Sequence, residues 1–178
     1  MTETERLRHG LIVSLAGRVE RMGRTAVMKL LYFLQTLKGV RLDYYFTLYH
    51  YGPFDSEVLS DLDYAEMSGL VKKTLHRYPR SESYIYSVGE KGIAPITEHE
   101  AALNWVVEMF GSRTAGELEM ASTIVFADRK AHEKKRTLSA AELATLVSEI
   151  KPYIKEARIK AEIDRLRTAD VLIALRND

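Results

Sequence analysis

One stretch of the chain, residues 48–71, changes its residue pattern twice and constrains the fold more than any other. It reads LYHYGPFDSEVLSDLDYAEMSGLV. The aromatic residues before Gly52 favour a strand, because such side chains pack well on a pleated surface. Pro53 cannot continue a central strand, since it has no backbone N–H to donate. Apolar residues with helical spacing follow Asp55, so the stretch predicts a strand, a sharp turn and a helix.

Two helices and the body of the strand are predicted before this turn. Apolar residues recur at every fourth position from Leu7 to Val19, which places them on one helix face. The segment RTAVMKLLYFLQTLKG, residues 24–39, has the same pattern and ends at Gly39. This second helix is apolar on more than one face, so we expect it in the core. Residues 43–51, DYYFTLYHY, follow as the aromatic strand.

A β-hairpin is predicted between residues 70 and 88. Residues 70–78 form one arm and residues 84–88 form the other. The polar segment YPRSES, residues 78–83, is typical of the turn between them. The helix before the hairpin has Asp55 or Ser56 as its cap and closes at Gly69.

The remainder of the chain has helical patterns, the first of them over residues 99–110. Two later positions have the spacing of a capping box, which satisfies backbone N–H groups at a helix start: Thr114 with Glu117, and Ser139 with Glu142. Pro152 either starts a new helix or kinks the preceding one. We expect the basic cluster RKAHEKKR, residues 129–136, at a helix end and the loop after it.

These patterns predict an α+β protein that is mostly α, with one domain over residues 1–178. Its N-terminal half, residues 1–92, has the order helix, helix, strand, helix, β-hairpin, which is close to a winged helix. Its C-terminal half, residues 93–178, is predicted to be a set of helices packed on the first half.

The composition excludes several classes of protein. There are no cysteines, so disulfides and cysteine nucleophiles are excluded. The net charge of +1 gives no global attraction to nucleic acid or membranes. The apolar runs are too short for a membrane span, and the charged start MTETERLRHG lacks the apolar core of a signal peptide. We therefore expect a cytoplasmic bacterial protein with no membrane partner.

Acidic residues dominate the helix that a winged helix would place on DNA. They are Glu57, Asp61, Asp63 and Glu66, and no lysine or arginine lies among them. Phosphates repel carboxylates, so we expect this helix not to read DNA. The hairpin differs, because it contains the nucleic-acid-binding candidates Lys72, Lys73, His76, Arg77 and Arg80. Two hypotheses stay open: a wing that contacts nucleic acid or a partner, and a solvated hairpin whose tyrosines pack on the body.

No catalytic, metal or cofactor site is predicted. The five histidines are scattered, and no two have the spacing of metal ligands. The chain has no phosphate-binding glycine loop and no nucleophile elbow. His50, between Tyr49 and Tyr51, is the best single candidate for a polar site, and the alternative is a strand histidine with one hydrogen-bond partner.

Four segments, in their order along the chain, resemble the Panacea family of SocA-like antitoxin domains. They are MKLLYFLQ (28–35), YHYGPFDSEVLSDLDYAEMSGLV (49–71), ELEMASTIVFADR (117–129) and IKPYIKEARIKAEIDRL (150–166). The resemblance implies a compact, mostly helical domain. It also implies a protein that neutralises a toxin by direct contact or acts as a protease adaptor.

We therefore expect a non-enzymatic interaction module, antitoxin-like or a regulatory adaptor, that binds a protein partner such as a toxin. The candidate contact residues are Tyr49, Tyr51, Phe54, Glu57 and Asp61. The alternative is a DNA-binding transcriptional regulator that contacts DNA through the basic hairpin, residues 72–86. A homodimer also stays open, because the C-terminal helices are amphipathic.

Overall fold

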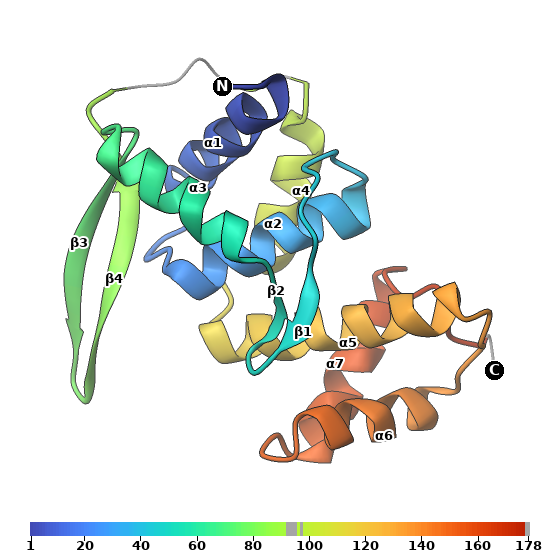
Figure 1. Ribbon diagram of the computed structural model, residues 1–178. Helices are drawn as coiled ribbons and strands as arrows, with labels where there is room; N and C mark the ends of the chain where they lie inside the picture. Colours follow the sequence, from blue (N-terminus) through green and yellow to red (C-terminus); the bar gives the residue numbers. More distant parts are fainter. Residues whose placement is uncertain (92–95, 97, 177–178) are drawn as a thin grey trace. The chain divides into compact units, whose positions relative to one another are not determined.

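The structure is a computed structural model, and it describes residues 1–91, 96 and 98–176. The described residues form seven helices and two small two-stranded sheets (Figure 1). The prediction of a mostly α, α+β fold is therefore confirmed. None of the helices in the described ranges is long and apolar enough to cross a membrane.

The chain divides into two compact units. The first contains Met1–Thr47 and Phe54–Leu118, and the second contains Leu48–Pro53 and Glu119–Asp178. The short loop from Leu48 to Pro53 therefore belongs with the C-terminal helices, although it lies far from them in the sequence. We expected two halves of the chain with a boundary near residue 92. The two units divide the chain elsewhere, because the helix Glu100–Phe110 belongs to the first unit.

The first unit is built around one apolar helix. Its elements are α1 (Glu3–Ala16), α2 (Arg24–Lys38), α3 (Ser56–Met67), β3 (Val71–Tyr78), β4 (Ser81–Val88) and α4 (Glu100–Phe110). In α2, Leu30, Leu31 and Phe33 are fully buried, and the ring of Phe33 stacks on that of Phe110 with centroids 4.0 Å apart. Gly39 ends α2 in the left-handed conformation. The central position that we expected for this helix is confirmed.

The hairpin of β3 and β4 is longer than predicted. Its register runs from Val71 opposite Val88 to Tyr78 opposite Ser81, which leaves only residues 79 and 80 in the turn. The turn was predicted over residues 78–83, but residues 81–83 belong to β4. Their polar side chains face solvent as in a turn, while their backbones pair with β3. At the other end, the N–H of Tyr86 donates to the carbonyl of Met22 at 2.8 Å. The order of elements agrees with our expectation, and the winged-helix assignment stays a prediction.

The predicted strand over residues 43–51 is mostly irregular. Only β1 (Thr47–Tyr49) and β2 (Gly52–Phe54) are strands in this region. Before them, the side-chain amide of Gln35 bonds both the N–H and the carbonyl of Tyr44, at 3.1 and 2.9 Å. A side chain thus satisfies the backbone groups that we expected a neighbouring strand to satisfy, so no ladder forms there.

The second unit consists of most of α5 (Ala115–Glu133), then α6 (Ala140–Ile150) and α7 (Glu156–Thr168), with α6 and α7 side by side (Figure 1). Both capping boxes are confirmed, the first at the start of α5 and the second at the start of α6. Pro152 separates two helices rather than kinking one. The basic cluster 129–136 covers the end of α5 and the following loop, as expected.

Candidate functional site

Gly52 turns the chain at a position that strongly favours glycine. Its φ of +87° lies in the region that side chains with a Cβ rarely adopt. A Cβ at this position would lie 2.9 Å from Oγ1 of Thr123 and 3.2 Å from Oγ of Ser122, both on α5. The loop from Leu48 to Pro53 therefore packs its backbone directly on α5.

Lys151 fixes the same loop from the other side. Its side chain is 1% exposed, and its ammonium donates to the carbonyl of His50 and to Oε1 of Glu119, the latter at 2.7 Å. A buried charge is costly unless it is paired and hydrogen-bonded, and both conditions are met here. The loop, α5 and the segment after α6 are thus joined by one buried ammonium group.

Tyr153 completes the cluster at the surface. Its hydroxyl donates to Oε1 of Glu119, although its side chain is largely exposed. Partial burial and the Glu119 carboxylate together raise the pKa of Tyr153 to about 12, because both disfavour a charged phenolate. Glu119 therefore accepts bonds from two residues of the segment that follows α6.

Four large side chains project from this well-fixed backbone: Leu48, Tyr49, Tyr51 and Tyr153. We call these four the aromatic corner. The three tyrosines are 59%, 69% and 65% exposed, and the ring of Tyr49 meets that of His50 edge-on at 4.7 Å. The contribution of His50 to the cluster is its backbone carbonyl, while its side chain is exposed. The predicted candidates Tyr49 and Tyr51 are thus accessible, and the corner combines apolar ring area with polar hydroxyl groups.

Three of the family-like segments meet at this corner. The turn at Gly52, the α5 residues around Glu119 and the Lys151–Pro152 pair lie far apart in the sequence but belong to one compact unit. Each contributes a contact that the others need.

Asp61, a predicted contact residue, is buried in the first unit. Its carboxylate accepts the hydroxyl of Tyr44 at 2.7 Å and lies 3.2 Å from Nε2 of His9. The guanidinium of Arg8 lies 3.6 Å from the same carboxylate and 4.1 Å from the centroid of the Tyr44 ring. Burial and the Asp61 charge raise the pKa of Tyr44 far above its ordinary value. Asp61 therefore joins α1, α3 and the irregular segment through a carboxylate that is mostly buried.

Glu57 and Phe54 lie nearer the surface of the same unit. Glu57 pairs with Arg8 at 2.6 Å at the edge of a hollow of about 600 Å³, which His9 and Tyr64 also line. Phe54 is half-buried. The five predicted contact residues thus divide between the two units, with Tyr49 and Tyr51 in the second and the other three in the first.

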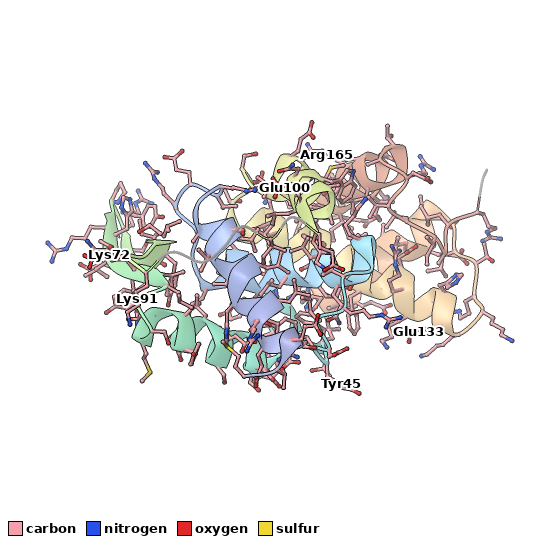
Figure 2. The ribbon with its side chains drawn as sticks, turned by 90° about the horizontal axis from the view of Figure 1, so that it is seen from above. Tyr45, Lys72, Lys91, Glu100, Glu133 and Arg165 are labelled. Carbon is pink, nitrogen blue, oxygen red and sulfur yellow. The ribbon has the colours of Figure 1, made fainter. Side chains whose placement is uncertain are left out.

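The basic residues of the hairpin do not form one patch. Alternate residues of a strand face opposite sides, so Lys73 and Arg77 share one face while Lys72 and His76 share the other. Arg80 lies in the turn. Figure 2 labels Lys72 on this hairpin, and Tyr45 elsewhere at the outer surface of the first unit.

Two of these hairpin cations also have acidic partners. Nζ of Lys73 lies 3.1 Å from Glu66, and Nε of Arg77 lies 2.9 Å from Glu82. The positive charge that the hairpin offers to a phosphate backbone is therefore smaller than its sequence indicates.

Sequence reasoning missed the residues that fix the corner. Lys151, Glu119 and Tyr153 belong to segments that were matched to the family, but their spacing gives no sign that they meet. Two basic members of the first unit's network, Arg8 and His9, were also missed. For Glu119, Arg8 and His9 the only sequence signal is a polar or charged residue beside apolar positions of a helix, which is common on helix surfaces as well. Lys151 and Tyr153 lie after the end of α6, where the sequence gives no such signal.

No protein-family model matches this chain, and a comparison with curated proteins finds no match. The resemblance to the Panacea family therefore rests on the motifs and their order. Among the residues that the structure describes, no three histidine or acidic side chains come together to hold a metal ion.

Proposed function

We propose that this chain is a non-enzymatic protein-interaction module that binds a protein partner through the aromatic corner. The observation that supports this most directly is the contrast between a fixed backbone and exposed side chains. Gly52 and Lys151 hold the loop in place, while Tyr49 and Tyr51 extend from it and Tyr153 extends from the segment after α6.

Such an arrangement favours binding for two physical reasons. A loop that is ordered before binding loses less conformational entropy when a partner arrives. Tyrosine adds apolar contact area and a hydrogen-bonding edge with only two rotatable bonds, which makes it common among the residues that dominate binding energy. The corner supplies three of them from two segments of one compact unit, the loop and the segment after α6.

The finer form of the proposal is an antitoxin-like or adaptor role in the cytoplasm, with a toxin as one class of partner. The order of the Panacea-like motifs supports it, and so do the contacts that those motifs make with one another in the second unit. DNA binding through the hairpin has less support, because Lys72 and Lys73 face opposite sides of it.

The test is site-specific photo-crosslinking in the native lysate. A photoreactive amino acid replaces Tyr51 in one variant and Tyr45 in a matched control. Tyr45 is 86% exposed in the first unit, outside the aromatic corner. We expect one defined crosslinked protein at position 51 and none at position 45. Mass spectrometry of the product then identifies the partner.

Two further variants connect the crosslink to the corner. Tyr49→Ala or Tyr153→Ala should weaken capture of the same partner by about tenfold, as loss of one dominant contact typically does. Equal crosslinking at positions 45 and 51, or capture that is unaffected by both alanine variants, would contradict the proposal.

A further inference from the structure

A second surface, in the first unit, is the outer edge of the β-hairpin. The strand β3, Val71–Tyr78, pairs along its full length with β4 on one side. On its other side, no strand of the described residues pairs with it, and it forms the outer side of the hairpin (Figure 1). Such an edge leaves a row of backbone N–H and C=O groups that can bond to another extended chain.

The strand register identifies the residues whose backbone groups point outward. The N–H of Tyr86 donates to Met22, which lies on the side of β4 away from β3. In an antiparallel pair, two residues that face each other either both direct their backbone groups toward the partner strand or both direct them away. Lys73 lies opposite Tyr86, so its N–H and C=O point to the outer edge. By alternation, those of Leu75 and Arg77 do the same, and no described backbone group outside the hairpin bonds to them.

An exposed apolar pair lies beside this edge. Leu75 faces Tyr84 across the hairpin, and the two side chains are 42% and 50% exposed. The same face is buried nearer the helices, at Val71 and Tyr86. A strand added at the outer edge would place a side chain directly beside Leu75, and an apolar side chain there would cover it.

The hairpin keeps an excess of positive charge after its ion pairs are counted. Its lysines and arginines are Lys72, Lys73, Arg77 and Arg80, and its one carboxylate is Glu82. Glu82 lies 2.9 Å from Arg77, and Glu66 of α3 lies 3.1 Å from Lys73. Lys72 and Arg80 have no ion-pair partner among the described residues, so these two cations remain uncompensated.

This charge favours one kind of added strand. A second copy of the chain would bring the same cations to the edge, and like charges that face each other across a sheet destabilise it. A strand with carboxylates at alternate positions would instead place them beside Lys72 and His76, which share one face. The residues between those carboxylates then lie on the face of Leu75.

We propose that the outer edge of β3 binds an extended acidic segment of a partner protein, which adds to the hairpin as a third strand. The backbone groups of Lys73, Leu75 and Arg77 supply the hydrogen bonds, and Lys72 attracts the carboxylates. Recognition of this kind takes its affinity from backbone bonds and its specificity from alternate side chains. The edge lies wholly in the first unit, so this site is separate from the aromatic corner.

Fluorescence anisotropy of the full chain with labelled peptides of about seven residues tests this inference, since typical strands have about this length. The probe peptide alternates glutamate and valine, so that carboxylates occupy one face and apolar side chains the other. One control peptide has lysine in place of glutamate, and a second has proline in place of the central valine. Each control should bind at least about tenfold more weakly, because the first meets like charge and the second cannot complete the ladder.

Hydrogen exchange locates the contact without any substitution. In the free protein, the amides of Thr74 and His76 should exchange slowly because they bond to β4. Those of Lys73, Leu75 and Arg77 should exchange fast, because they face solvent at the outer edge. A saturating amount of the glutamate peptide should slow exchange at these three amides by about tenfold or more.

Two pairs of variants separate the backbone from the side chains. Leu75→Pro removes an outward N–H, which a strand edge tolerates, and should weaken peptide binding by about tenfold. Leu75→Ala keeps that N–H and should weaken binding by about threefold. Lys72→Glu should weaken binding by about tenfold, whereas Lys155→Glu, an equal change of charge in the second unit, should change it by less than about threefold. Circular dichroism and slow exchange at Thr74 confirm that each hairpin is folded.

Four results would overturn the inference. The first is no binding of the glutamate peptide, or equal binding of that peptide and either control. The second is a peptide complex in which the outward amides of β3 exchange as fast as in the free protein, and this result decides the question even where Leu75→Pro disturbs the hairpin. The third is an equal loss of affinity from Lys72→Glu and Lys155→Glu. The fourth is slower exchange of the same amides as the concentration of the protein alone rises, which would make a second copy the occupant.

Discussion

The ammonium of Lys151 lies 2.7 Å from the carboxylate of Glu119, at a point where the lysine side chain is 1% exposed. The same ammonium donates to the carbonyl of His50. One buried charge therefore connects a helix, an inter-helix segment and the loop that presents the aromatic corner. The following predictions begin from this contact.

Lys151→Met should destabilise the fold by about 3–5 kcal/mol, because Glu119 would lose its cation in a site that water reaches poorly. Urea denaturation measures the change. The control Lys155→Met removes an exposed lysine from the start of α7 and should change stability by less than about 0.5 kcal/mol. Equal effects of the two substitutions would show that the buried pair is not needed.

Gly52→Ala should be more damaging than Gly39→Ala. Both glycines have positive φ, so each substitution costs about 1–2 kcal/mol of backbone strain. A Cβ at Gly39 meets nothing within 4 Å, whereas a Cβ at Gly52 would overlap Thr123. That overlap should add about 1–3 kcal/mol to the loss at Gly52. Thermal denaturation compares the variants, and equal losses would mean that the loop does not pack closely on α5.

Asp61→Asn should cost about 3 kcal/mol or more, because it leaves Arg8 with less negative charge in a buried network. The control is Asp63→Asn on the same helix, where the aspartate is half exposed and pairs with Arg24. That variant should lose at most about 1 kcal/mol. Chemical denaturation of both variants decides the matter, and a similar loss in each would contradict the role assigned to Asp61.

Tyr153 should make part of the stability depend on alkaline pH. Its pKa is raised in the folded protein from 10.0 to about 12, so folding favours the protonated phenol. The stabilisation is fully present below pH 10 and is lost as the pH rises through about 12. The difference in ultraviolet absorbance between the wild-type protein and Tyr153→Phe follows this phenol during titration. A midpoint near 10 would show that Glu119 does not affect it.

The helices and their starts could be predicted from neighbouring residues alone. The cap at Asp55 and the capping box at Ser139 depend on contacts within three positions, which any window of sequence contains. The buried face of α2 follows from helical spacing in the same way. The extent of β4 was not predicted, because Ser81 and Ser83 pair through their backbones and their polar side chains resemble those of a turn.

The position of the candidate site depended on contacts between distant residues. Lys151 is 101 positions from His50 and 32 from Glu119, so no local pattern relates them. Asp61 has the same residue type as Asp63, yet packing of α3 on α1 buries the first and leaves the second half exposed. The sequence settled which segments become helices, since helix formation is governed by near neighbours. Only the tertiary structure decided which charged and aromatic side chains are paired, buried or presented, because burial and pairing depend on residues that meet only after the chain has folded.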